Sequence, residues 1–277
     1  MQRLTKQQLA FFDTFGFLLL PGLLNDCIDQ VIDTFEHVWA ERGGGHAGRE
    51  HDGKARSCIV PFIDQHPRLC ALLDDPRIEG AIASILGDDF NYMGSDGKFY
   101  VGDTGWHSDG GDFCVKFIKV ALYLDPLTRD TGALRVIPGS HRFGDSYADD
   151  LSRLLGLSES VLGVHGRDVP AYAIETKPGD VAIFNHKTKH AAFGGSVRRR
   201  MFTINCSQRF PEDRLDDLRT YIGHHARFLV DRVYGQTMVA TASPQRKVHL
   251  EQAMANDGHL AALVAEARQR QTEPARG

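Results

Sequence analysis

The stretch VKFIKVALYLDP, residues 115–126, decides the fold class. It is short, rich in β-branched and aromatic residues, and ended by an Asp-Pro pair, which is typical of a buried β-strand. Four further segments have the same character: GKFYVG (97–102), ALRVIPGS (133–140), GDVAIFN (179–185) and RRMFTINC (199–206). Because turn residues separate these segments, we expect a mainly β core over residues 89–206.

The sequence on either side of this core carries helix signals. Thr5 and Gln8 form a capping-box pattern, and Asp75-Pro76 is a typical helix start. We expect a single domain with helices flanking the core. Its predicted parts are N-terminal helices and a first strand over 1–88, a core over 89–206 with an irregular or helical insertion at 145–170, and C-terminal helices over 207–277 that end in a disordered tail, QTEPARG.

Composition restricts the class of partner. The 277 residues carry a net charge of -4 with a pI near 6.3, which argues against binding to nucleic acid or to an anionic membrane. No stretch has the length of a membrane span or the pattern of a signal peptide. The five cysteines are scattered and form no C-x-x-C pair, as in a reduced protein. We expect a cytoplasmic monomer or homodimer that acts on a small molecule.

The motif WHSDG, residues 106–110, predicts a metal site. His107 and Asp109 are two residues apart and project to one face of an extended chain. An iron(II) site for oxygen chemistry requires a second imidazole. The downstream candidates are His141, His165, His186, His190, His224, His225, His249 and His259. Two of them, His186 and His190, follow the predicted strand in PGDVAIFNHKTKHAAFGG, and their positions alone do not choose between them.

The order of these segments resembles the phytanoyl-CoA dioxygenase family of iron(II)- and 2-oxoglutarate-dependent oxygenases. The resemblance runs from LTKQQLAFFDTFGFLLLPGLL through WHSDG and TGALRVIPGSHR to PGDVAIFNHKTKHAAFGGSVRRRMFTI, about residues 4 to 206. It implies a double-stranded β-helix, a jelly-roll barrel of the cupin type, with flanking helices. It also implies that iron(II), 2-oxoglutarate and dioxygen are the cofactor and cosubstrates.

The resemblance assigns His107, Asp109 and His190 as the iron ligands, and it places His186 at a family position that is not a ligand. The family usually has Gly-Ser after the distal histidine, where this chain has Ala191-Ala192. Family members that halogenate lack the ligand carboxylate. Because Asp109 is present, the resemblance implies hydroxylation, with release of succinate and carbon dioxide, or a related desaturation, epoxidation or cyclisation.

A cosubstrate dicarboxylate requires a fixed cation for its distal carboxylate, and a guanidinium offers bidentate geometry. Strand alternation places Arg199 on the polar face with Thr203, whereas Arg200 shares a face with apolar residues. The family register also favours Arg199. We therefore expect Arg199 to bind 2-oxoglutarate with Thr203 as a hydroxyl donor, and Arg200 is the alternative to Arg199.

The substrate is the least determined part of this hypothesis. We expect a small or medium polar metabolite, such as a natural product, an amino acid or a phosphonate, with Lys98, Lys116 and His141 as candidate substrate-binding residues. The cations Lys54, Arg56, Lys98, Lys116 and Lys119 are scattered in sequence and form no obvious patch. A cupin-like metalloenzyme that does not use 2-oxoglutarate is the alternative function.

Overall fold

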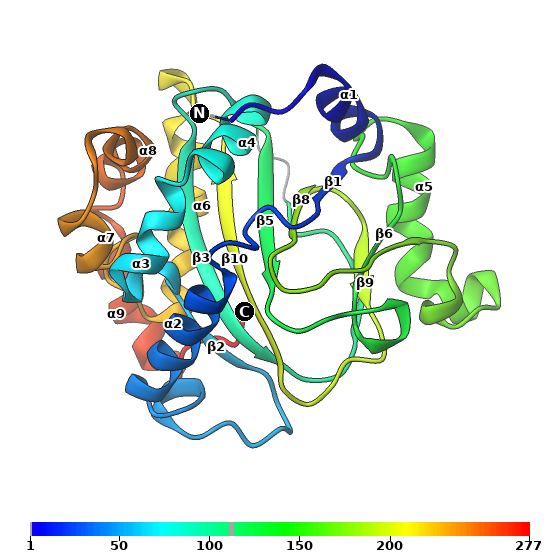
Figure 1. Ribbon diagram of the computed structural model, residues 1–277, viewed down its shortest axis with the longest axis horizontal. Helices are drawn as coiled ribbons and strands as arrows, with labels where there is room; N and C mark the ends of the chain where they lie inside the picture. Colours follow the sequence, from blue (N-terminus) through cyan, green and yellow to red (C-terminus); the bar gives the residue numbers. More distant parts are fainter. Residues whose placement is uncertain (1, 111–113) are drawn as a thin grey trace.

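The core consists of two antiparallel β-sheets, described in a computed structural model that covers residues 2–110 and 114–277 (Figure 1). The larger sheet has six strands in the order β1-β8-β5-β10-β3-β2, and the smaller has four in the order β4-β9-β6-β7. Most neighbouring strands in the two sheets are not consecutive in the sequence. This order is that of a jelly roll, in which the chain crosses repeatedly between two facing sheets.

Six of the strands, β1, β3, β5, β6, β8 and β10, lie in or overlap predicted β segments, and the other four do not. The strands are β1 (Phe17–Leu20), β2 (Ser57–Ile59), β3 (Asn91–Tyr100), β4 (Thr104–His107), β5 (Phe117–Tyr123), β6 (Leu134–Val136), β7 (Tyr172–Ile174), β8 (Val181–Asn185), β9 (His190–Ala192) and β10 (Arg199–Ser207). The short strand β2 lies in the N-terminal part, where the sequence predicted only one strand. It pairs with β3 and completes the edge of the larger sheet.

Strand β5 shows how the sequence orients the larger sheet. Ile118, Val120 and Leu122 belong to the core beneath the helices. The alternate residues Ala121 and Tyr123 face the space between the two sheets. Because side chains alternate along a strand, one strand supplies both layers of the molecule, and polar residues on the inner face can line a cavity.

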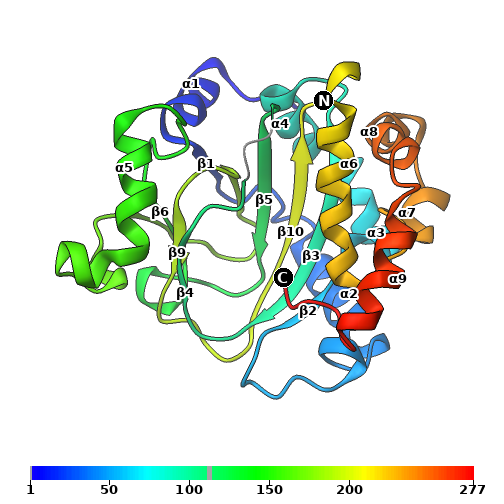
Figure 2. The ribbon, with the colours of Figure 1, turned by 180° about the vertical axis from the view of Figure 1, so that it is seen from behind.

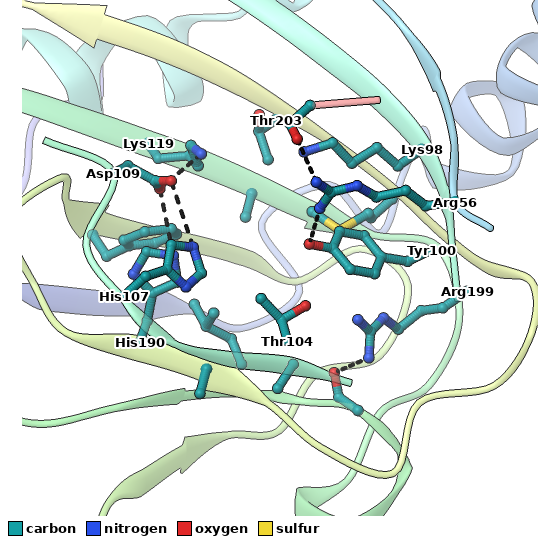
Figure 3. A pocket seen from close by; sticks show the side chains of 18 of the residues that line it. Arg56, Lys98, Tyr100, Thr104, His107, Asp109, Lys119, His190, Arg199 and Thr203 are labelled. Carbon is teal, nitrogen blue, oxygen red and sulfur yellow. Dashed lines mark hydrogen bonds and ion pairs between the residues drawn. The ribbon is translucent and has the colours of Figure 1, made fainter. Parts of the chain in front are cut away.

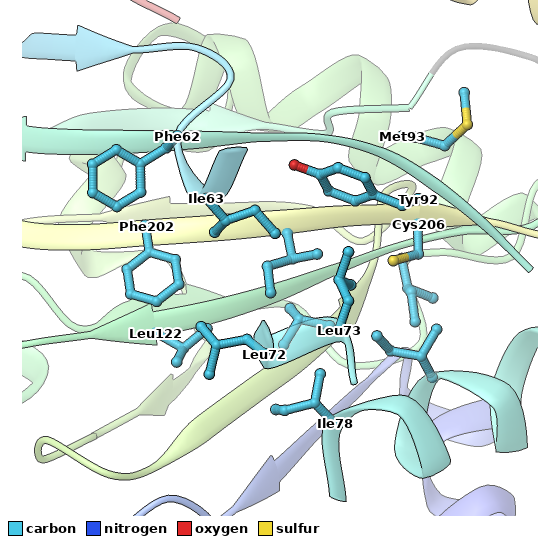
Figure 4. Close-up of a cluster of buried hydrophobic side chains, with 14 of the residues drawn as sticks. Phe62, Ile63, Leu72, Leu73, Ile78, Tyr92, Met93, Leu122, Phe202 and Cys206 are labelled. Carbon is cyan, nitrogen blue, oxygen red and sulfur yellow. The ribbon is translucent and has the colours of Figure 1, made fainter. Parts of the chain in front are cut away.

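Helices cover the outer face of the larger sheet (Figure 1). The helices are α1 (Lys6–Phe15), α2 (Ile28–Glu41), α3 (Pro67–Cys70), α4 (Pro76–Leu86), α5 (Ser146–Leu154), α6 (Leu215–Gly223), α7 (Gln236–Ala240), α8 (Pro244–Ala255) and α9 (Leu260–Arg270). Buried aromatic residues such as Phe62 and Phe202 join these helices to the sheet (Figure 4). The insertion, with α5, lies instead beside the smaller sheet.

The predicted helix starts are confirmed by their caps. The Thr5 side chain accepts a hydrogen bond from Gln8 N, and the Gln8 side chain accepts one from Thr5 N. Asp75 caps α4, which begins at Pro76 and ends before Gly87. The starts of α1 and α4 are fixed by local hydrogen bonds and backbone preferences, which can be recognised in the sequence.

The C-terminal segment differs from the expectation of a disordered tail. The segment after α9 runs back across β3 (Figure 2), and Ala275 N donates to Arg227 O at 2.8 Å. Arg276 Nη1 donates to Arg56 O at 2.8 Å. The tail carries little apolar area, but these long-range hydrogen bonds fix it, and local composition cannot reveal them. Within the described ranges, no helix has the length and apolarity needed to cross a membrane.

Candidate metal centre

Three side chains that the family resemblance assigns as ligands converge between the two sheets (Figure 3). His107 ends β4 and His190 begins β9, and the two are directly paired across these antiparallel strands. Asp109 follows β4, where the main-chain amides of Asp109 and Gly110 donate to His186 O at 2.9 and 3.1 Å. Candidate ligand atoms of His107, Asp109 and His190 all lie within 4.8 Å of one another.

Main-chain hydrogen bonds orient both imidazole rings. His107 Nδ1 lies 2.8 Å from Gly105 O, and His190 Nδ1 lies 2.9 Å from Thr188 O. A carbonyl oxygen only accepts, so Nδ1 carries the proton in each ring and Nε2 keeps its lone pair. The two Nε2 atoms point toward Asp109, at 3.7 Å from Oδ1 for His107 and 3.4 Å from Oδ2 for His190. This donor set suits iron(II).

Burial and charge keep His190 and Asp109 in their metal-binding protonation states. Burial lowers the pKa of His190 to about 4, so its imidazole stays neutral at physiological pH. Burial alone would raise the pKa of Asp109, but the Lys119 ammonium, with Nζ 2.8 Å from Asp109 Oδ2, holds it well below its usual range. Asp109 therefore remains a carboxylate at the mouth of the cluster.

His186, the other candidate for the second imidazole, lies outside the three-residue cluster found among the described residues. Its contribution to the site comes from its main chain, because His186 O anchors the loop that carries Asp109. Its ring is buried, and burial lowers its pKa to about 4. The geometry thus favours His190, which the register with His107 brings to the cluster.

The cluster opens into a cavity of about 570 Å³ that also contains Arg199. The Arg199 side chain is buried, its Nη1 donates to Gly132 O at 2.8 Å, and its guanidinium lies 4.9 Å from the centre of the Tyr100 ring. Its Nε has no hydrogen-bond partner among the described residues. A buried cation with an unused donor calls for an anionic ligand, so Arg199 fits a dicarboxylate cosubstrate.

Arg200 has a different environment although it is the next residue. It lies on the outer side of the sheet, where its guanidinium pairs with Asp125 at 2.6 Å and with Glu36 at 3.0 Å. Thr203 and Lys98 both line the cavity with Arg199. Figure 3 shows Thr203 on the Lys98 side of the cavity.

Two predicted substrate-binding residues, Lys116 and His141, do not line this cavity. Lys116 has the same strand parity as Ile118, so its side chain projects away from the inner face, and its Nζ lies 3.4 Å from Asp13 Oδ1. His141 lies in the turn after β6, with Nε2 3.2 Å from Asp13 O. Lys119, with the opposite parity, is the lysine of this strand that reaches the site.

Two residues of the cavity were not assigned to the site from the sequence. Alternation along β5 could have identified Lys119, because it shares a face with Ala121 and Tyr123. Arg56 had no such signal, since it precedes a strand of three residues, β2, that only pairing with β3 defines. It reaches the same cavity and donates to the Tyr100 hydroxyl at 2.8 Å.

Solved structures with the same fold include three enzymes. The first is the non-heme, alpha-ketoglutarate-dependent carbocyclase SnoK from nogalamycin biosynthesis, with a TM-score of 0.58 and 18% identity, covering 74% of this chain and 84% of that one. The second is HygX from Streptomyces hygroscopicus with nickel and 2-oxoglutarate bound, with a TM-score of 0.58 and 15% identity, covering 76% of this chain and 89% of that one. The third is EctD from S. alaskensis with 2-oxoglutarate and 5-hydroxyectoine, with a TM-score of 0.55 and 21% identity, covering 74% of this chain and 76% of that one. These identities support the fold alone, and the predicted double-stranded β-helix is confirmed.

A search of curated proteins finds no match to the chain. The family model for phytanoyl-CoA dioxygenase (PhyH) matches residues 12–201, more than half of the sequence. That interval contains both histidines and the carboxylate of the cluster, together with Arg199. The chain therefore belongs to the phytanoyl-CoA dioxygenase family, the oxygenases that use iron(II), 2-oxoglutarate and dioxygen.

Proposed function

We propose that this chain hydroxylates an unactivated C–H bond of a small or medium polar metabolite, with iron(II) held by His107, Asp109 and His190. One observation carries the proposal. Two imidazoles whose Nδ1 atoms are fixed by main-chain carbonyls face the Asp109 carboxylate, in a cavity that also contains an arginine without an acidic partner in the described residues. Two imidazoles and one carboxylate are the donor set of iron(II) oxygenases that leave positions open for ligands.

Arg199 is proposed to hold the distal carboxylate of 2-oxoglutarate, because it is buried and its Nε has no partner among the described residues. Arg200 has two carboxylate partners already and is the weaker candidate. Thr203 remains a proposed hydroxyl donor to the cosubstrate. When bound, iron and 2-oxoglutarate supply the oxidising chemistry, and the protein orients the substrate and excludes water.

Lys119 holds Asp109 in place while leaving it ionised. Because Lys119 Nζ binds one carboxylate oxygen, Oδ2, the other oxygen is the more available to a metal. The presence of Asp109 also favours hydroxylation over halogenation, since halide would need the position that this carboxylate takes. The 2-oxoglutarate-independent alternative is disfavoured by Arg199, for which such an enzyme has no evident use.

Oxidative ring closure is the second candidate reaction, because one protein with the same fold is a carbocyclase. The two reactions differ in whether an oxygen atom from dioxygen enters the product. Candidate metabolites are incubated with iron(II), 2-oxoglutarate and isotopically labelled dioxygen, and succinate and product masses are followed. Hydroxylation predicts substrate-dependent succinate and one labelled oxygen atom in the product. Loss of two hydrogen atoms without label would instead assign a cyclase or desaturase.

A further inference from the structure

Positive charge gathers in the cavity beyond what the metal centre uses. Five cationic side chains line it, namely Arg56, Lys98, Lys119, Arg199 and Arg227, and they come from distant parts of the sequence. Among the described lining residues Asp109 is the only aspartate or glutamate. A second carboxylate, Asp96, lies next to Lys98, with 3.1 Å between Nζ and Oδ1.

Most of these charges already have a counterpart. Lys119 pairs with Asp109 and Lys98 with Asp96. The charges of a bound iron(II) ion and a bound 2-oxoglutarate dianion cancel each other. Arg199 is proposed to bind the distal carboxylate of the cosubstrate. Arg56 and Arg227 have no aspartate or glutamate partner within ion-pairing distance in the described part of the chain, and Arg56 donates instead to the Gly277 oxygen. Even if that oxygen offsets Arg56, Arg199 and Arg227 leave the loaded cavity positively charged. Such a cavity favours an anionic substrate.

Arg56 and Lys98 form a corner of the cavity separate from Arg199. Figure 3 shows the Tyr100 ring between the Arg56 and Arg199 side chains. Their guanidinium carbons lie 5.4 and 4.9 Å from the ring centre. The Tyr100 hydroxyl accepts a hydrogen bond from Arg56 Nη1 at 2.8 Å and so fixes the direction of that guanidinium. Lys98 is buried beside it, with Nζ 5.7 Å from the same ring centre.

The chain itself places an oxygen acceptor in this corner. Arg56 Nη2 donates to the main-chain oxygen of Gly277. Gly277 also lies against Lys98, because a Cβ atom built on it would be 2.8 Å from Lys98 Cε. The segment is held there by the hydrogen bond from Ala275 N to Arg227 O. This contact shows that the corner can hold an oxygen acceptor and that Arg56 directs a donor toward it.

We propose that Arg56, Lys98 and Arg227 form an anion subsite that binds an oxyanion group of the substrate. A carboxylate or a phosphate-type group has oxygens that match the two-pronged guanidinium of Arg56, and the ammonium of Lys98 adds charge. Binding there displaces the Gly277 oxygen and leaves the opposite end of the substrate facing the metal cluster. The inference rests on the proposed function and specifies its substrate class as anionic.

The test measures anion binding without turnover. Protein loaded with iron(II) and 2-oxoglutarate in the absence of dioxygen is titrated calorimetrically with sulfate, acetate and neutral glycerol. We expect Arg56→Gln to weaken binding of the preferred anion at least tenfold and Arg227→Gln to weaken it severalfold. Arg153→Gln, which changes an exposed arginine on α5, should have no effect. Preference for sulfate indicates a phosphate-type group, and preference for acetate indicates a carboxylate.

The same samples distinguish failure of the anion subsite from failure of the proposed oxygenase function. The visible band of the iron–2-oxoglutarate chelate reports the proposed function and the folded state of each variant. If the band forms but sulfate and acetate bind no better than glycerol, or bind Arg56→Gln as tightly as wild type, the anion subsite alone is overturned. If Arg56→Gln abolishes the band, Arg56 belongs to the cosubstrate site and the subsite is overturned as well. Absence of the band in wild type removes the proposed function together with this inference.

Discussion

Arg199 and Arg200 are adjacent in sequence, yet strand alternation gives them opposite environments. Arg199 is buried in the cavity, and Arg200 is paired with Asp125 and Glu36 on the other side of the sheet. We predict that Arg199→Gln raises the dissociation constant of 2-oxoglutarate about tenfold to a hundredfold, because it removes charge-assisted hydrogen bonds. Anaerobic titration with 2-oxoglutarate measures this constant.

Arg200→Gln is the matched control, since it removes the same charge one residue away. It should change 2-oxoglutarate binding by less than about twofold, the size expected for a screened charge outside the site. If Arg200→Gln weakens binding and Arg199→Gln does not, the cosubstrate lies elsewhere and the assignment of the cavity is wrong.

His225 is a buried histidine outside the metal cluster, and it tests how burial affects acid stability. Burial lowers its pKa to about 4, whereas an unfolded histidine titrates near a pKa of about 6.5. Between these values the unfolded chain binds more protons than the folded chain, so the free energy of unfolding falls as pH falls from about 6.5 to 4. We predict that His225→Asn reduces this slope by up to about 1.4 kcal/mol per pH unit.

Urea unfolding of the metal-free protein at several pH values between about 7 and 5 measures this slope. His224→Asn, at the exposed neighbouring position, is measured alongside as the matched histidine substitution. Equal slopes for wild type and His225→Asn would show that His225 is protonated in the folded state and that its burial has no such effect.

Only some residues of the candidate site can be identified from the sequence. The spacing of His107 and Asp109 is visible as a local motif, because two residues in an extended chain share a face. The choice of His190 over His186 depends on the register between β4 and β9, which pairs His190 with His107. Arg56 could not be predicted, because its place in the cavity follows from the pairing of β2 with β3.

Among the elements, β3 is packed more tightly than its sequence suggests. Gly97 faces Phe62, which is fully buried, and a Cβ atom at Gly97 would overlap the Phe62 ring. No side chain fits there without a shift of the ring. The glycine therefore lets the segment around Phe62 close over the sheet and complete the aromatic core (Figure 4).

We predict that Gly97→Ala lowers the free energy of unfolding by about 1–3 kcal/mol, the usual cost of overpacking a core. Chemical denaturation measures this change. Gly156→Ala is the control, because a Cβ atom there has no heavy atom within 4 Å, and it should change stability by less than about 0.5 kcal/mol. Combining Gly97→Ala with Phe62→Leu should cost less than the sum of the two single changes, and strict additivity would contradict the contact.

Elements whose signals are local were predicted well. The caps of α1 and α4 follow from Thr5, Asp75 and Pro76, and the strand β5 follows from its β-branched run. The segment after α9 departs from its prediction because its order depends on partners far away in sequence, such as Arg56 and Arg227. Composition describes how much area a segment can bury, and it does not describe hydrogen bonds to distant residues.

At the scale of the whole molecule, the two sheets divide the site between them. The smaller sheet and the loop after β4 carry the metal cluster, His107, Asp109 and His190. The larger sheet carries the cationic residues Lys98, Lys119 and Arg199. Residues of both sheets thus line one cavity, and Lys119 of the larger sheet reaches across to Asp109. Because these residues come from separate strands of two sheets, only the complete fold brings them together.

We propose that His190, and not His186, completes an iron site that binds 2-oxoglutarate. The most direct measurement is an anaerobic titration of metal-free protein with iron(II) and 2-oxoglutarate, which follows the visible band of the chelate in wild type, His190→Ala and His186→Ala. Circular dichroism checks that each variant is folded. We predict that the band forms in wild type and His186→Ala and is lost in His190→Ala. A band that persists in folded His190→Ala, or is lost only in His186→Ala, would contradict the claim.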